Sequence, residues 1–194
     1  MHIQYCFPTA IFMTSNEGLA DQMLPITKKY LSDQSKINYN QNYKTTYFGK
    51  KDGLEINEDM NLFSNYISEL AIEFMRKQGY KIRFPQFKPF IFANEMYEND
   101  HHNVHSHANS MLSGVFYLQT PEGSGSISFY DPKPRRNFIS RETEFETDSN
   151  MNIFNVQPKK GLLLIWESWL EHSVMRNHSK DDSRISLVFN LTRP

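Results

Sequence analysis

Cysteine is nearly absent from this chain, which has one, Cys6, among its 194 residues. An internal disulfide is therefore excluded, and so is a zinc site built from several cysteines. Apolar runs of about 20 residues, which a membrane span requires, are also missing, and the N-terminus lacks the basic start of a secretory signal. We therefore expect a soluble protein of the cytoplasm, where thiols stay reduced.

An excess of charge of either sign is missing as well. The 21 Lys and Arg residues nearly balance the 22 Asp and Glu residues, which leaves a formal net charge of -1. No long block carries one sign, so the sequence indicates neither a nucleic-acid-binding surface nor a polybasic membrane patch. A chain of this length usually forms one domain around one core. We expect a single domain over residues 1–194, with a support region at 1–88 and a β-rich core at 89–194.

The first half of the chain has the pattern of a scaffold. Residues 3–14 are rich in Ile, Tyr, Phe and Thr and predict an edge strand interrupted by Pro8. Apolar residues at helical spacing predict a helix over 19–31, and a polar stretch at 32–43 predicts a loop. The strongest helix is expected to begin at Asn57 or Glu58 and to end at Gly79, with an apolar stripe that packs on a sheet.

From Tyr80 onward the pattern changes to short strands separated by turns. About seven or eight such strands, with Gly, Pro and Asp between them, favour an antiparallel sandwich or barrel. The expected fold is therefore mainly β, a jelly roll with the N-terminal helices packed on one sheet. Such a fold brings residues from distant strands to one open mouth.

Histidine is concentrated around one possible site. His105 and His107 are separated by one residue and precede an apolar run, so in extended backbone they point to the same face. Two imidazoles can then converge on one ion, because a His nitrogen lies roughly 2.0–2.1 Å from a zinc-sized metal. His172, which follows the strand-like run Gly161–Trp166, is the best candidate for a third ligand.

Other ligands remain open for this metal site. Asp131 or Asp100 could supply a carboxylate, and His101 could replace one of the named histidines. We rank the site of three histidines first, because the i, i+2 spacing fixes the convergence of two of them.

The last strand carries a possible carboxylate-binding group. Arg184 and Ser186 share one face of the predicted strand, and an arginine fork can bind a carboxylate through two hydrogen bonds. Tyr117 and Ser113 share a face of the strand that follows the HxH pair, and they can supply hydroxyl groups to the same anion.

The order and spacing of these motifs resemble those of a known family. HxH, then SGVFYL, then a distal histidine in SWLEHSV, then RxS twelve residues later, resembles the iron(II)- and 2-oxoglutarate-dependent oxygenases. More narrowly, it is similar to an oxygenase family that has HxH followed by SGVYYL and a late SWLxHxV segment. The resemblance covers roughly residues 90 to 192. It implies a double-stranded β-helix, which agrees with the strand pattern.

The resemblance also implies a role for each site residue. His105 and His172 would be ligands of Fe(II), with His107 at the position where most of the superfamily has Asp or Glu. The distal carboxylate of the cosubstrate 2-oxoglutarate would be bound by Arg184 and Ser186, and O2 would be the oxidant. The remaining residues assigned to the cosubstrate pocket are Tyr117, Ser113 and Asn94. No catalytic side chain is expected beyond the metal centre.

The expected reaction is hydroxylation of a C–H bond with formation of succinate and CO2. The resemblance to prolyl-hydroxylase-like proteins favours a peptide substrate, with proline the first candidate, or else a small molecule. Trp166, Phe129 and Phe189 are candidates for the apolar walls, and the charged segment at 133–150 could recognise the substrate. Two alternatives remain: a cupin-like metal dioxygenase that does not use 2-oxoglutarate, and a non-catalytic binding or structural protein on a jelly-roll scaffold.

Overall fold

The computed structural model describes most of the chain. The described residues are 2, 7–34, 36–38, 43–47, 53–82, 87–132, 142, 144–147 and 150–193. Cys6, part of the expected first strand, and most of the segment at 133–150 that was assigned to substrate recognition lie outside these residues.

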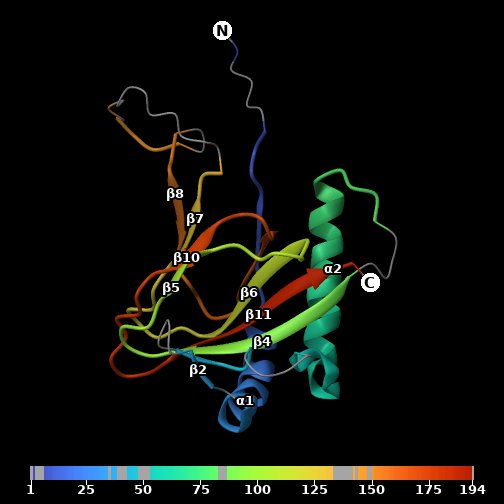
Figure 1. Cartoon of the computed structure of the whole chain (residues 1–194), viewed down its shortest axis with the longest axis vertical. Helices are drawn as coiled ribbons and strands as arrows, with labels where there is room; N and C mark the ends of the chain where they lie inside the picture. Colours follow the sequence, from blue (N-terminus) through green and yellow to red (C-terminus); the bar gives the residue numbers. More distant parts are fainter. Residues whose placement is uncertain are drawn as a thin grey trace.

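Two antiparallel sheets face each other, which confirms the prediction of a mainly β fold (Figure 1). The larger sheet has the strand order β1 (Ile11–Ser15), β9 (Leu162–Glu167), β6 (Leu112–Gln119), β11 (Arg184–Thr192), β4 (Lys88–Met96), β3 (Tyr43–Thr45) and β2 (Lys36–Asn38). The smaller sheet has the order β5 (His102–His105), β10 (His172–Val174), β7 (Ile127–Tyr130) and β8 (Ile153–Val156). From Tyr80 onward the described residues form eight strands, β4 to β11, in agreement with the seven or eight predicted, while β1, β2 and β3 come from the first half of the chain.

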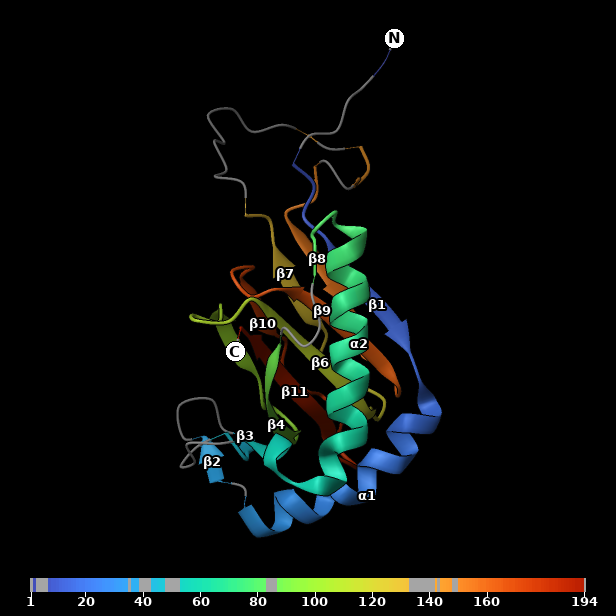
Figure 2. The same cartoon turned by 90° about the vertical axis from the view of Figure 1, so that its right-hand side faces the viewer.

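Two helices cover the outer face of the larger sheet, as predicted (Figure 2). Helix α1 (Glu17–Gln34) begins after Asn16, whose Oδ1 accepts a hydrogen bond from the backbone N–H of Leu19 at 3.0 Å. It is longer than expected and, with β2, replaces much of the loop predicted at 32–43. Two 3₁₀ turns (Leu54–Ile56 and Glu58–Met60) precede helix α2 (Asn61–Lys77), which ends just before Gly79 at a φ of +85°.

Alternation along the strands separates two apolar layers. In β11, Ile185, Leu187, Phe189 and Leu191 join the core under the helices. The alternate residues of β11, which include Arg184, face the smaller sheet and line a cavity. Phe189 was a candidate for the wall of this cavity, but that prediction was wrong. Its ring lies on the helix side, 5.9 Å from the ring of Phe63 in α2.

The division of the chain at residue 88 remains a prediction. Residues before this point do more than cover the sheet, because β1 forms one edge of the larger sheet and β2 and β3 extend it at the other. β1 pairs with β9 and confirms an edge strand over part of the predicted range, since Ile11–Ser15 form a strand and residues 7–10 do not.

Gly114 in β6 lies where the sheet packs against the ring of Phe189. A methyl group on Gly114 would collide with that ring and would lie 2.6 Å from the carbonyl oxygen of Leu164. We expect Gly114→Ala to lower the free energy of unfolding by about 1–3 kcal/mol, measured by urea denaturation. Gly18→Ala is the control, because Gly18 lies in α1, where the nearest atom to an added methyl would be 3.7 Å away. Equal stability of Gly114→Ala and the parent protein would contradict this packing.

Candidate metal centre and cosubstrate pocket

The smaller sheet brings three histidines from remote segments together. His105 ends β5, His107 lies two residues beyond it, and His172 begins β10. β5 and β10 are neighbours, and His172 pairs directly with His105. One ring nitrogen from each of the three residues can be chosen so that all lie within 4.8 Å of one another. The structure therefore brings together the three residues that the sequence predicted, although His107 lies past the end of the strand rather than within it.

The ring nitrogens of these histidines suit a metal ion. Nδ1 of His172 lies 2.9 Å from the carbonyl oxygen of Leu170, and Nδ1 of His105 lies 2.8 Å from that of Asn103. Since a carbonyl only accepts, each Nδ1 carries the proton, and the lone pair is left on Nε2. Nε2 of His107 and Nε2 of His172 are 3.2 Å apart. Two nitrogens at right angles on one metal would be about 3 Å apart, so the donor set fits a divalent ion.

Burial keeps these imidazoles neutral, which is the form that binds metal. It lowers the pKa of His172 to about 3 and that of His107 to about 4, with His105 adding to both shifts. Burial lowers the pKa of His105 as well. At neutral pH the group therefore offers lone pairs without first losing protons.

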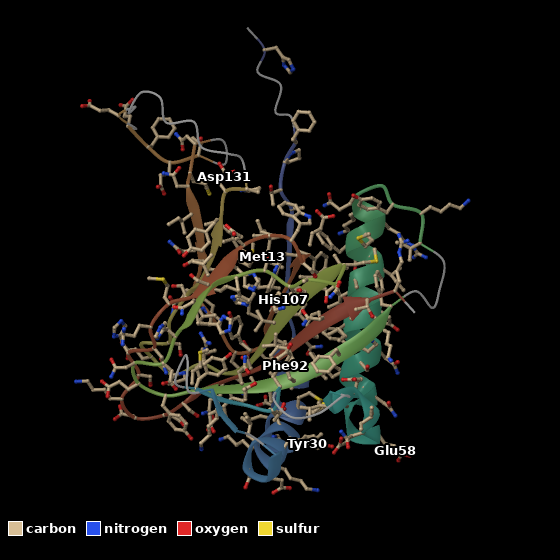
Figure 3. All side chains as sticks on the ribbon, in the orientation of Figure 1. Met13, Tyr30, Glu58, Phe92, His107 and Asp131 are labelled. Carbon is tan, nitrogen blue, oxygen red and sulfur yellow. The ribbon has the colours of Figure 1, made fainter. Side chains whose placement is uncertain are left out.

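The alternative metal ligands do not join this group. Asp100 is buried, and its Oδ2 accepts a hydrogen bond from the backbone N–H of Tyr97 at 2.8 Å. Asp131 follows β7 and lines a different cavity beside β1, and Figure 3 shows it well apart from His107. In the part of the chain that the structure describes, neither these carboxylates nor His101 belongs to a group that could hold a metal. The structure thus favours three histidines over a set that includes one of these residues.

A cavity of about 470 Å³ lies next to the histidines, between the two sheets. Arg184, Ser186, Tyr117 and Asn94 all line it. Ser186 pairs with Asn94 on β4 on one side and with Tyr117 on β6 on the other, so these three form one row across the sheet. The structure therefore gathers four of the five residues that were assigned to the cosubstrate.

Arg184 is the buried cation of this cavity, with 2% of its surface exposed. Its guanidinium donates to the carbonyl oxygen of Gly125 at 3.0 Å and contacts the sulfur of Met96, and Nε has no partner. No carboxylate among the described residues forms a salt bridge with it. Burial lowers its pKa, and burial raises the pKa of the neighbouring Tyr117 to about 12. A buried charge without an ion pair is costly, so this end of the cavity is built for an anion.

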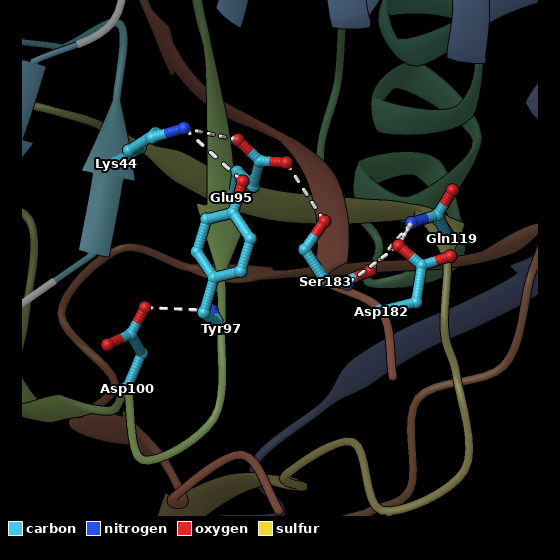
Figure 4. A network of polar contacts seen from close by, with 7 residues as sticks. All are labelled: Lys44, Glu95, Tyr97, Asp100, Gln119, Asp182 and Ser183. Carbon is cyan, nitrogen blue, oxygen red and sulfur yellow. Dashed lines mark hydrogen bonds and ion pairs between the residues drawn. The ribbon is translucent and has the colours of Figure 1, made fainter. Parts of the chain in front are cut away.

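A network of hydrogen bonds fixes the residue before Arg184 (Figure 4). Ser183 donates from its hydroxyl to Oε1 of Glu95 at 2.9 Å, and its carbonyl accepts from Nε2 of Gln119 at 2.8 Å. Lys44 pairs with the same Glu95 at 3.5 Å. The start of β11, and with it Arg184, is therefore tied to β3, β4 and β6.

Ser113 is placed differently from the expectation. It shares a face of β6 with Tyr117, but it does not line the cavity. Its hydroxyl lies 2.8 Å from Oγ of Ser168 and donates to Oδ1 of Asn190 at 2.8 Å. The hydroxyl is thus already bonded within the protein, and Ser113 supports Asn190 instead of reaching into the cavity.

Several residues that line the cavity had no role in the sequence-based prediction. His102 lies beside the triad, with its Nδ1 2.8 Å from Nδ1 of His105. Tyr43 and Tyr47 come from β3 and the turn after it, and Phe92 and Asn190 come from β4 and β11. Asn190 could have been found by continuing the alternation of β11 from Arg184. The position of β3 beside β4 has no such signal in the sequence.

Comparison with known proteins agrees with the geometry. The profile of a family described as "Putative 2OG-Fe(II) oxygenase" matches residues 91–190, 100 of the 194 residues of the chain. The chain belongs to this family. By family and by its histidine triad, the protein is an Fe(II)- and 2-oxoglutarate-dependent oxygenase. No curated protein matches the sequence of this oxygenase.

Solved structures share the fold of this oxygenase. A prolyl-4-hydroxylase from Pseudomonas putida has a TM-score of 0.66 at 11% identity, covering 96% of this chain and 94% of that chain. The epimerase SnoN from nogalamycin biosynthesis has a TM-score of 0.70 at 13% identity, covering 95% and 78%. A prolyl hydroxylase from Trichoplax adhaerens, in complex with a peptide fragment, has a TM-score of 0.66 at 11% identity, covering 94% and 83%. At these identities the likeness shows the fold, the double-stranded β-helix of 2-oxoglutarate oxygenases.

Neither helix of the described residues combines the length and the apolar character that crossing a membrane requires.

Proposed function

We propose that His105, His107 and His172 bind Fe(II) and that Arg184 binds the distal carboxylate of 2-oxoglutarate. The observation that carries this assignment is the meeting of three neutral imidazoles beside a cavity whose floor holds a buried guanidinium. Two His and one carboxylate are usual for this chemistry. With three imidazoles the metal site is one charge unit more positive.

The residues around Arg184 bind and orient the cosubstrate. Tyr117 stays protonated at physiological pH because burial raises its pKa to about 12, so its hydroxyl can donate to a carboxylate. Ser186, in the same row, supplies a second hydroxyl, and Asn94 supplies an amide NH2 group that can donate to the carboxylate. When bound, iron and 2-oxoglutarate would activate O2, which oxidises 2-oxoglutarate to succinate and CO2 and supplies the oxidant for the substrate.

The apolar side chains between the polar groups exclude water. Val115 and Val188 lie side by side on β6 and β11, and Trp166 packs its ring 4.8 Å from that of His172. Phe129, also a candidate for this wall, does not line the cavity, and its ring packs 5.0 Å from that of Trp166. A dry site strengthens the electrostatic contacts made by Arg184.

We further propose that the reaction hydroxylates a C–H bond of a peptide, with a prolyl residue the first candidate, or of a small molecule. The P. putida neighbour is named as a prolyl-4-hydroxylase, and the T. adhaerens neighbour is in complex with a peptide. Tyr43, Tyr47 and Phe92 line the cavity. Such aromatic rings offer apolar faces on which a saturated ring can pack.

Anaerobic titration with Fe(II) and 2-oxoglutarate tests the assignment of the cofactors. The chelate of the two should produce a weak visible charge-transfer band with the protein. Absence of the band at saturating ligand would contradict the proposal. Succinate formation with proline-containing peptides, compared with the same peptides carrying alanine, then tests the substrate.

A further inference from the structure

The cavity floor changes from polar to apolar and back to polar along β11. Residues that lie opposite each other on neighbouring strands form a row across the sheet. Successive rows on one face of the sheet are two residues, or about 6.6 Å, apart along each strand. From the Arg184 end, the rows are Asn94–Ser186–Tyr117, Phe92–Val188–Val115 and Asn190–Ser113–Trp166. The first row belongs to the cosubstrate in the function proposed above. The third row has no assigned ligand.

The third row holds two N–H donors that have no hydrogen-bond partner among the described residues. The hydroxyl of Ser113 donates to Oδ1 of Asn190, which turns the amide NH2 group of Asn190 away from β6. Within the described residues no acceptor contacts this NH2 group, although Asn190 is only 9% exposed and lines the cavity. Nε1 of Trp166 is buried and has no partner among the described residues, and this side chain lines the same cavity.

Unpaired donors of this kind require an explanation. A buried N–H such as Nε1 of Trp166 is costly to leave unpaired, so in native proteins such a group usually has a partner, for example a water molecule or a ligand. Asn190 is also held in place, because the hydroxyls of Ser113 and Ser168 form a chain that ends on its carbonyl oxygen. A donor fixed by buried bonds is already oriented for an incoming acceptor.

One cosubstrate molecule does not account for both polar ends of the cavity. Arg184 and Asn190 are six residues apart on one strand, which separates their backbones by roughly 20 Å. The guanidinium of Arg184 is held by Gly125 and Met96, and Met96 is its pair on the neighbouring β4. It therefore does not extend along β11 toward Asn190. A five-carbon diacid bound to Arg184 leaves the far row free.

We propose that Asn190 and Trp166 form a second hydrogen-bonding subsite, which binds a carbonyl or carboxylate oxygen of the substrate to be oxidised. This proposal depends on the proposed function in one respect, which is that 2-oxoglutarate binds at the Arg184 end of the cavity. The subsite adjoins the histidine triad, because the ring of Trp166 lies 4.8 Å from that of His172. Val188 and Val115 between the two ends suit an aliphatic group. The substrate class is thus a compound that carries an amide or acid group close to the C–H bond that reacts.

Nuclear magnetic resonance can follow both donors directly. The chain has two tryptophans, and Trp169 is the internal control, since it is 51% exposed and its Nε1 already donates to Glu167 at 2.9 Å. ¹⁵N-labelled protein saturated with Zn(II) and 2-oxoglutarate is titrated with N-methylacetamide and, separately, with acetate. We expect saturable shifts of the Trp166 indole signal and of the Asn190 NH2 signals, while the Trp169 signal stays in place. Trp169→Phe assigns the two indole signals.

Two variants separate recognition from folding. Asn190→Asp keeps the size of the side chain but replaces the donor by an oxygen, and it should weaken binding of N-methylacetamide by about tenfold. Ser113→Ala keeps the amide and removes the bond that orients it, so it should weaken the same probe by a smaller factor. The spectrum of each variant reports whether it is folded.

Two results would overturn the proposal. The first is that neither probe shifts the Trp166 and Asn190 signals. The second is that 2-oxoglutarate alone moves both signals and that no probe then changes them, which would place the cosubstrate in this row. A failure of the proposed function would give a different result. In that case 2-oxoglutarate would leave the signals of Tyr117 and Arg184 unchanged, with or without the probes.

Discussion

Substitution of His107 by alanine is expected to abolish Fe(II) binding, whereas His107→Asp is expected to retain it. His107 and His172 place their Nε2 atoms 3.2 Å apart, and removal of one imidazole leaves two ligands, too few to hold the ion. Loss of a residue that only orients a metal ligand costs 10- to 100-fold in affinity, so loss of a direct ligand should cost more than about 100-fold. Aspartate at this position would restore the usual set of two His and one carboxylate.

The measurement is anaerobic titration of each variant with Fe(II) in the presence of 2-oxoglutarate, followed by the visible chelate band. His178→Ala is the matched control, because His178 is exposed and does not belong to the triad. Its band should equal that of the parent protein. A full band with His107→Ala would show that this imidazole is not a ligand and would remove the basis of the site with three histidines.

Substitution of Arg184 by methionine should abolish 2-oxoglutarate binding without destabilising the ligand-free protein. Arg184 is 2% exposed and has no carboxylate partner among the described residues, so its charge lowers the stability of the protein until an anion binds. Removing one partner of a buried charge pair costs about 2–5 kcal/mol of binding free energy, roughly 30-fold or more in affinity. Methionine keeps most of the volume of the side chain and removes the charge.

Thermal unfolding in Zn(II)-loaded protein measures both effects. 2-Oxoglutarate should raise the melting temperature of the parent protein and leave that of Arg184→Met unchanged. Without 2-oxoglutarate, the variant should melt at the same temperature as the parent or above it. Arg176→Met is the control, because Arg176 is exposed and donates to the carbonyl oxygen of Asn99 at 3.3 Å. Undiminished stabilisation of Arg184→Met by 2-oxoglutarate would favour a metal dioxygenase that does not use this cosubstrate.

Most of the site residues that could be predicted from the sequence were found from the alternation of side chains between the two faces of a strand. Arg184 and Ser186 were assigned to one face of the last strand, and both line the cavity. The same rule placed Ser113 beside Tyr117, and this is where it fell short. Alternation assigns a face, but it does not show that the hydroxyl of Ser113 is already bonded to Ser168 and Asn190. For Phe189 the same rule holds, because this residue lies an odd number of positions from Arg184 and therefore faces the helices instead of the cavity.

Elements built from local contacts were predicted better than those built from distant ones. The helix that begins near Asn61 has an apolar stripe in its own sequence, and its end at Gly79 follows from the left-handed backbone there. β5 and β10 have four and three residues, and they depend on pairing between distant segments, because β10 pairs with β5 on one side and with β7 on the other. A strand as short as β10 shows no period, so the sequence did not separate it from a loop, whereas extended backbone was predicted at His105 in β5.

The sequence by itself determined the chemical groups of the site, which are three imidazoles, one arginine and the hydroxyls of Ser186 and Tyr117. Their spacing along the chain also determined which of them share a face of a strand. Tertiary structure decided which of them meet. The pairing of His172 with His105 across 67 residues, the exclusion of Asp100 and Asp131, and the row of Asn190 and Trp166 all depend on the order of strands in two sheets. Contacts between distant segments set that order, so it cannot be predicted from local patterns in one sequence.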